Sequence, residues 1–161
     1  MSTAVAPDLS ERRFDLRHQV PVPFASDRSS GYGVDRRATP DGPADLGEVV
    51  KARSLQCALS RVCGLCGMSL AAGGRGTVFV GSVAEADAGS FAFPPMHPEC
   101  ASYALETYPR LGVPVLGQAL VLAEWAVVVT GGFDLERPAE RGARAVFHPN
   151  AVTSTQVVTP G

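Results

Sequence analysis

The chain has 161 residues, of which 45% are hydrophobic and 19% charged, and this composition is typical of one folded domain. Its formal net charge of −2 offers no overall attraction to nucleic acid or to an anionic membrane. The longest apolar stretch, 119–130, is about a dozen residues, contains Glu124 and is too short to cross a bilayer. The first eight residues lack the pattern of a secretory signal, so we expect a cytoplasmic protein with reduced cysteines.

Residues 1–44 are predicted to form an extended arm, because prolines interrupt them repeatedly and 26–33 are polar. The short apolar piece 20–24 is expected to lie as an edge strand or as a packed extended segment, with partial disorder as the alternative. We therefore divide the chain into a proline-rich arm, 1–44, and a single domain, 45–161.

A helix is predicted to follow the arm. Asp45 is suited to be its N-cap, with Glu48 reaching back in a capping box. Apolar residues at helical spacing continue toward the first clustered cysteine: Leu55, Ala58, Leu59 and Val62. The sequence C-G-L-C-G at 63–67 then predicts a tight turn.

The next segment reads as a hairpin and a helix. Residues 77–80 predict a strand, 90–93 its partner, and 81–89 an acidic loop between them. Pro98 suits the first turn of a helix that ends before Pro109. The last third is predicted to be strand-rich, with strands at 120–130, 144–148 and 153–158 and a turn at Gly131 and Gly132.

Four residues form a pattern typical of a metal site. Cys63 and Cys66 make a C-x2-C pair, and His97 and Cys100 make an H-x2-C pair at the start of the predicted helix. Three thiolates and one imidazole complete a closed tetrahedral zinc site of the structural type, and a helix N-terminus favours the thiolate form. Turn, hairpin and helix is the order found in treble-clef zinc fingers. We predict an α+β, treble-clef-like fold organised around one structural Zn²⁺.

Two other interpretations of the cysteines remain open. Cys63 and Cys66 would be a redox pair in one, and all four cysteines would be buried apolar side chains in the other. Cys57, on the predicted helix, is expected to face the core, with replacement of a ligand as the alternative. His18 is expected to be exposed and His148 to end a strand, so no second metal site is predicted.

Three stretches resemble a group of small actinobacterial and phage-associated proteins of unknown function, some of them labelled envelope-biogenesis proteins. They are C-G-L-C-G at 63–67, T-V-F-V at 77–80 and F-P-P-M-H-P-E-C-A at 93–101. The resemblance extends in outline to V-P-V-P-F at 20–24 and is specific only over about 63–108. The chain lacks two further cysteines of that group, near 82–84 and at the end of the helix. The resemblance implies the zinc fold and no reaction.

Three functions follow from these features. A closed metal site without a recognisable catalytic pairing favours a protein-binding accessory or adaptor module. The alternative is a zinc-stabilised enzyme of a small-molecule biosynthetic or nucleotide pathway, whose candidate groups are Glu99, Tyr103, Glu106, Tyr108 and His148. Nucleic-acid binding is a second alternative, supported by three arginines near the turn but disfavoured by the acidic balance: Arg53, Arg61 and Arg75.

Overall fold

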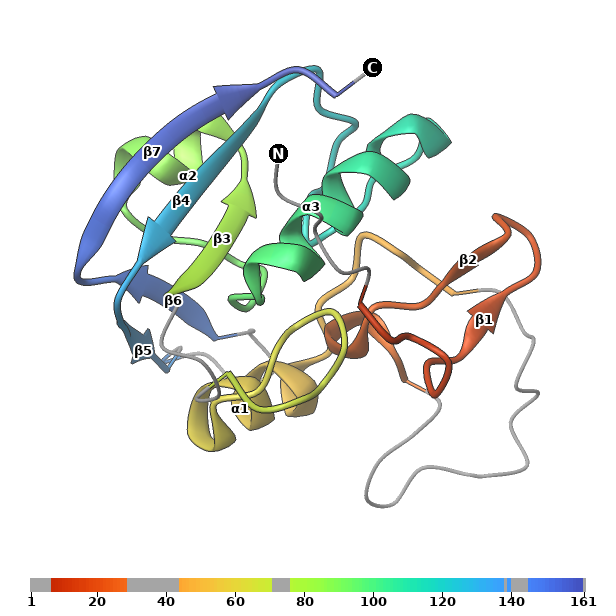
Figure 1. The fold of residues 1–161 in the computed structure, drawn as a ribbon, viewed down its shortest axis with the longest axis horizontal. Coiled ribbons are helices and arrows are strands. Elements are labelled where there is room, and N and C mark those ends of the chain that lie inside the picture. The colour runs from red at the N-terminus through yellow and green to blue at the C-terminus, as the bar shows by residue number, and fades with distance from the viewer. Residues whose placement is uncertain (1–6, 29–43, 71–75, 138, 140–144, 161) are drawn as a thin grey trace.

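The computed structural model describes residues 7–28, 44–70, 76–137, 139 and 145–160. The chain combines helices with antiparallel sheets and is therefore an α+β protein (Figure 1). Among the described residues, no helix has the length and apolar character needed to cross a bilayer. The helices and 3₁₀ turns are η1 (Phe24–Ser26), α1 (Lys51–Ser60), α2 (Val83–Ala88), α3 (Pro98–Thr107) and η2 (Pro109–Leu111). The strands are β1 (Phe14–Asp15), β2 (Val20–Pro21), β3 (Thr77–Gly81), β4 (Trp125–Thr130), β5 (Phe133–Glu136), β6 (Val146–Pro149) and β7 (Val152–Val158).

The main sheet has three antiparallel strands in the order β3-β4-β7. Strand β4 is central, and its valines pack on both faces of the sheet. Val129 pairs with Val78, and Val128 pairs with Phe79, so alternate residues enter different cores. The strands β5 and β6 form a separate two-stranded sheet, as do β1 and β2.

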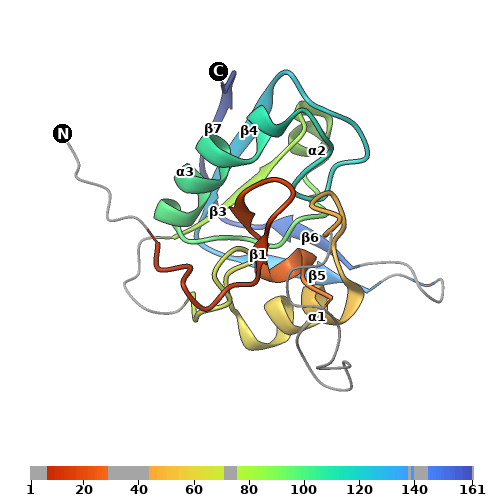
Figure 2. The same cartoon turned by 90° about the vertical axis from the view of Figure 1, so that its right-hand side faces the viewer.

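One core lies between the main sheet and α3. Val78 and Val80 of β3 share it with Ala101 and Ala104 of α3 and with Trp125, and all of these side chains are buried. Figures 1 and 2 show α3 alongside this sheet. Burial of this apolar area supplies the main driving force for docking the helix.

The other core is an aromatic cluster on the opposite face. The Phe79 ring stacks on Phe91 with centroids 5.2 Å apart and meets the edge of Phe133 at 5.9 Å. Phe147 completes the cluster, with its centroid 5.7 Å from that of Phe133. Strands β5 and β6 therefore attach to the main sheet through phenylalanine side chains.

The described part of the arm is packed against the domain. Val22 and Ala25 are fully buried, and the backbone N–H of Phe24 donates to the carbonyl of Leu65 at 2.9 Å. The Tyr108 hydroxyl donates to the carbonyl of Pro21 at 2.6 Å. The apolar piece 20–24 is thus a packed segment that begins with a short strand. This agrees with the expectation of ordered packing and not with that of partial disorder.

The predicted hairpin is wrong. Residues 90–93 do not pair with β3, because β4 lies along one edge of that strand and Met96 bridges Val78 on the other. Phe91 forms a bridge with Phe147 instead. The predicted acidic loop is mostly the helix α2. Its N-cap Ser82 accepts from the N–H of Glu85, whose carboxylate accepts from the N–H of Ser82 in return.

The helix predicted with Asp45 as its N-cap has Val50 in that position instead and begins at Lys51. The Asp45 carboxylate accepts from the N–H of Gly47 in a local turn, and Glu48 pairs with Arg28 of the arm. Both carboxylates are therefore engaged outside the helix. Strand β4 likewise begins at Trp125 rather than at residue 120, whereas α3, β6 and β7 confirm the predicted helix and terminal strands.

Candidate metal centre

Cys63 and Cys66 lie on a short turn that follows α1, here called the knuckle (62–70). The N–H of Cys63 donates to the carbonyl of Met68, and the N–H of Gly67 donates to the carbonyl of Cys63. Val62 and Ser69 form an antiparallel bridge across its base. Because these bonds close the turn, both sulfur atoms point to the same side.

His97 and Cys100 come from the start of α3. His97 is the N-cap and Pro98 takes the first helical position, where a missing N–H costs nothing. The preceding residue fixes the place of His97, because the N–H and carbonyl of Met96 both bond to Val78 at 2.9 Å. The carbonyl of Pro95 also accepts from the N–H of Gly64, which joins this segment to the knuckle.

The four ligand atoms lie within 4.8 Å of one another. The Nδ1 atom of His97 is 3.5 Å from the Cys66 sulfur and 3.7 Å from the Cys100 sulfur. Its Nε2 atom is 2.8 Å from the carbonyl oxygen of Ser69, an acceptor, so Nε2 carries the proton and Nδ1 keeps a lone pair. Metal-binding histidines are commonly oriented by such a bond on the far nitrogen.

The thiols interact so strongly that they do not ionise independently. Burial opposes ionisation of Cys63, but hydrogen bonds from Cys100, Cys66 and backbone amides hold the pKa of Cys63 well below its usual value. Hydrogen bonds to Cys63 and then to Cys66, together with burial, raise the pKa of Cys100. One thiolate thus forms readily and suppresses its neighbours. Three thiolates at this spacing need a cation between them, and this donor set fits a metal ion.

Phe24 of the arm covers the outside of the knuckle. Gly67 has a φ of +76°, and a Cβ atom there would lie 2.6 Å from the Phe24 ring. The guanidinium groups of Arg53 and Arg12 lie 4.2 and 5.1 Å from the centre of the same ring. The sequence gives no signal that predicts this contact, because the phenylalanine and the cysteine turn are about forty residues apart.

The structure separates the remaining cysteine and histidines from this group. Cys57 is fully buried in the aromatic core, as expected, and burial raises the pKa of its thiol. His18 was expected to be exposed, but its side chain is 17% exposed and its Nδ1 atom is 2.8 Å from the Asp15 carboxylate. His148 bonds the carbonyl of Gly89 and the Glu136 carboxylate. Among the described residues, one metal-ligand cluster is present.

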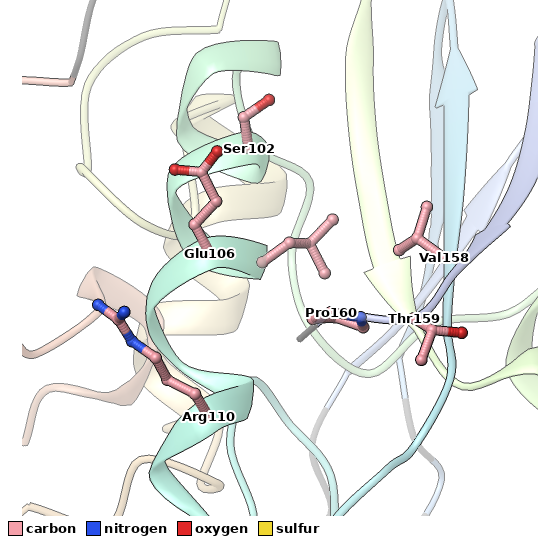
Figure 3. Close-up of a pocket in the computed structure, with 7 residues that line it drawn as sticks. Ser102, Glu106, Arg110, Val158, Thr159 and Pro160 are labelled. Atoms are coloured by element: carbon pink, nitrogen blue, oxygen red, sulfur yellow. The ribbon is translucent and has the colours of Figure 1, made fainter.

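The candidate catalytic groups do not converge. Tyr108 is fully buried, which raises its pKa, and its ring packs edge-on against Tyr103. Glu106 and Arg110 line an open pocket of about 490 Å³ between α3 and the end of β7 (Figure 3). Figure 3 shows both side chains pointing away from Thr159, so the pocket does not gather polar groups around one point.

Two of the three arginines considered for nucleic-acid binding cover aromatic rings. Arg53 is 7% exposed and lies over Phe24, and Arg61 lies 4.8 Å from the ring centre of Phe133. Arg75 lies outside the described residues. These contacts give the first two guanidinium groups a packing role.

The fold and the site together define the class of protein. The chain is an α+β protein with a Cys3His group whose geometry can hold one metal ion. No known family, curated protein or solved structure was found to match it.

Proposed function

We propose that Cys63, Cys66, His97 and Cys100 bind one Zn²⁺ and that this ion has a structural role. The observation that carries the proposal is the convergence of four ligand atoms within 4.8 Å, with His97 already oriented by the Ser69 carbonyl. Three thiolates and one neutral imidazole give a closed tetrahedral set with a charge of about −1. Such a site is a weak Lewis acid and leaves no position for a reacting water.

The architecture around the ion is treble-clef-like in this proposal. The knuckle provides one pair of ligands, and the first turn of α3 provides the other. Between them, the hairpin of a treble clef is reduced to β3 and the single antiparallel bridge of Val78 with Met96. In this proposal that bridge replaces the hairpin, because it positions His97 beside the knuckle.

The ion would also hold the arm. Phe24 and Ala25 bond to the carbonyls of Leu65 and Gly64 within the knuckle, so a knuckle that opens releases the packed part of the arm. We infer that the zinc fixes a binding surface and that the protein acts as a protein-binding accessory module. Four free cysteines and a thiolate site suit a reducing compartment, and we place the protein in the cytoplasm.

Elemental analysis tests the metal. Wild-type protein is expected to hold one zinc per chain, and Cys63→Ser and Cys100→Ser are expected to lose it. Cys57→Ala is the matched control, because it removes a buried cysteine outside the cluster and should keep the zinc. A metal-free wild type that unfolds cooperatively would refute the structural role, since structural zinc supplies about 10–16 kcal/mol coupled to folding.

The adaptor role needs its own experiment. The tagged chain is purified from its native cells, and the proteins that accompany it are compared with those that accompany Cys100→Ser. A partner that accompanies only the zinc-loaded form is the expected result. If no protein is enriched with either form, the accessory role is wrong even where the zinc is present.

A further inference from the structure

The strand β7 leaves one edge of the main sheet open. It pairs with β4 on one side, and no described segment pairs with it on the other. Figure 1 shows β7 at the outer rim of the sheet, on the side of the molecule away from β1 and β2. Every second residue of an edge strand directs its N–H and carbonyl outward, where another strand can bond to them.

Apart from one irregularity near its start, this edge lacks the usual protection in the part of the chain that the structure describes. Natural edge strands are shielded by lysines, prolines, covering segments or bulges. The sequence of β7, V-T-S-T-Q-V-V, contains no charge and no proline, and six of its seven residues are exposed. Val152 is 51% and Val157 49% exposed. The one irregularity, opposite Val129 and Thr130, lies at the start of the strand and leaves 154–158 regular.

We propose that β7 pairs with β7 of a second copy of this chain, antiparallel and about a two-fold axis near Gln156. Because the strand is uncharged throughout, such pairing places no like charges opposite each other. The two main sheets then join into one continuous sheet, and neither copy keeps an open edge there. A charged partner peptide would find no complementary charge on this strand.

In the antiparallel pair, the end of β7 in one copy meets the start of β7 in the other. A single pair of strands makes an interface of the small class, so we expect a weak dimer.

Sedimentation equilibrium tests the pairing. The wild type is expected to shift from the mass of one chain to that of two as the protein concentration rises. Gln156→Lys and Gln156→Glu each place like charges beside the axis, so each variant should lose the dimer. An equimolar mixture of the two should regain it. Leu59→Lys, at a 65% exposed position on α1, is the matched control and should dimerise like the wild type.

Three outcomes would overturn the proposal: a wild type that stays monomeric, Gln156 variants that dimerise unchanged, or assemblies that grow beyond two copies. Zinc is measured in the same samples, because β7 contributes no ligand to the metal cluster. A zinc-loaded monomer therefore removes the dimer and leaves the zinc proposal intact. A dimer that holds no zinc removes the zinc proposal and leaves the dimer intact.

Discussion

The contact between Gly67 and Phe24 gives a quantitative test of how tightly the arm packs on the knuckle. Gly67→Ala meets two costs. A left-handed φ of +76° costs a residue with a Cβ about 1–2 kcal/mol. The new Cβ atom would also lie 2.6 Å from the Phe24 ring, and crowding of this kind costs about 1–3 kcal/mol.

Gly89→Ala separates the two costs. Gly89 has a nearly identical φ of +70°, but no atom lies within 4 Å of the position that its Cβ would take. This variant should therefore show the backbone cost alone. For a chain of this size, 1 kcal/mol shifts Tm by about 2–4 °C. Gly67→Ala should thus melt about 2–12 °C below Gly89→Ala, given a crowding cost of about 1–3 kcal/mol.

Thermal unfolding monitored by circular dichroism measures the difference, with saturating zinc in both samples. The Phe24→Leu background provides a further check. The smaller side chain makes room for the Cβ atom at position 67, so the penalty of Gly67→Ala should fall toward that of Gly89→Ala. Equal melting temperatures for the two alanine variants would refute the contact between the arm and the knuckle.

Two further predictions concern hydrogen-bonded polar side chains. Tyr108 has a raised pKa, so its contribution to stability is present below the unfolded-state value of 10.0 and is lost as the pH rises above it. Tyr108→Phe should cost about 0.5–1.5 kcal/mol at neutral pH, through the lost bond to Pro21, and should flatten the alkaline fall in urea titrations. A fall as steep as that of the wild type would contradict this assignment. Glu85→Ala removes the acceptor of the Ala92 N–H and the side chain that bonds the N–H of the N-cap Ser82, and should cost about 2–3 kcal/mol. Asp87→Ala, an exposed change on the same helix, should stay within about 0.5 kcal/mol, and equal losses would exclude the capping role.

The four residues of the candidate metal site could be found in the sequence because each pair is defined locally. Two intervening residues bring Cys63 and Cys66 onto one turn, and Pro98 marks the helix start that carries Cys100. The spacing of the cysteines and the histidine does not reveal the contacts that hold these side chains in place. The carbonyl that orients His97 belongs to Ser69, and a backbone acceptor leaves no signature in side-chain identity.

The strand pairing could not be predicted in the same way. The sequence shows that 77–80 is strand-forming, but it does not show which distant strand lies beside it. Residues 90–93 are the nearest strand-forming stretch in sequence, whereas the strand that pairs with β3 is β4, about fifty residues away. The helix α2, in contrast, carried a readable signal, since Ser82 followed by Glu85 is a capping box.

The order of these parts along the chain has a consequence for synthesis on the ribosome. All four ligands lie between 63 and 100, so they emerge before any residue of β4 or β7. At about 5–20 residues per second, the nascent chain presents a complete ligand set several seconds before its sheet can close. Under the zinc proposal, metal capture is the earliest long-range contact available to the nascent chain, and the zinc supply during translation would limit how much of the protein folds.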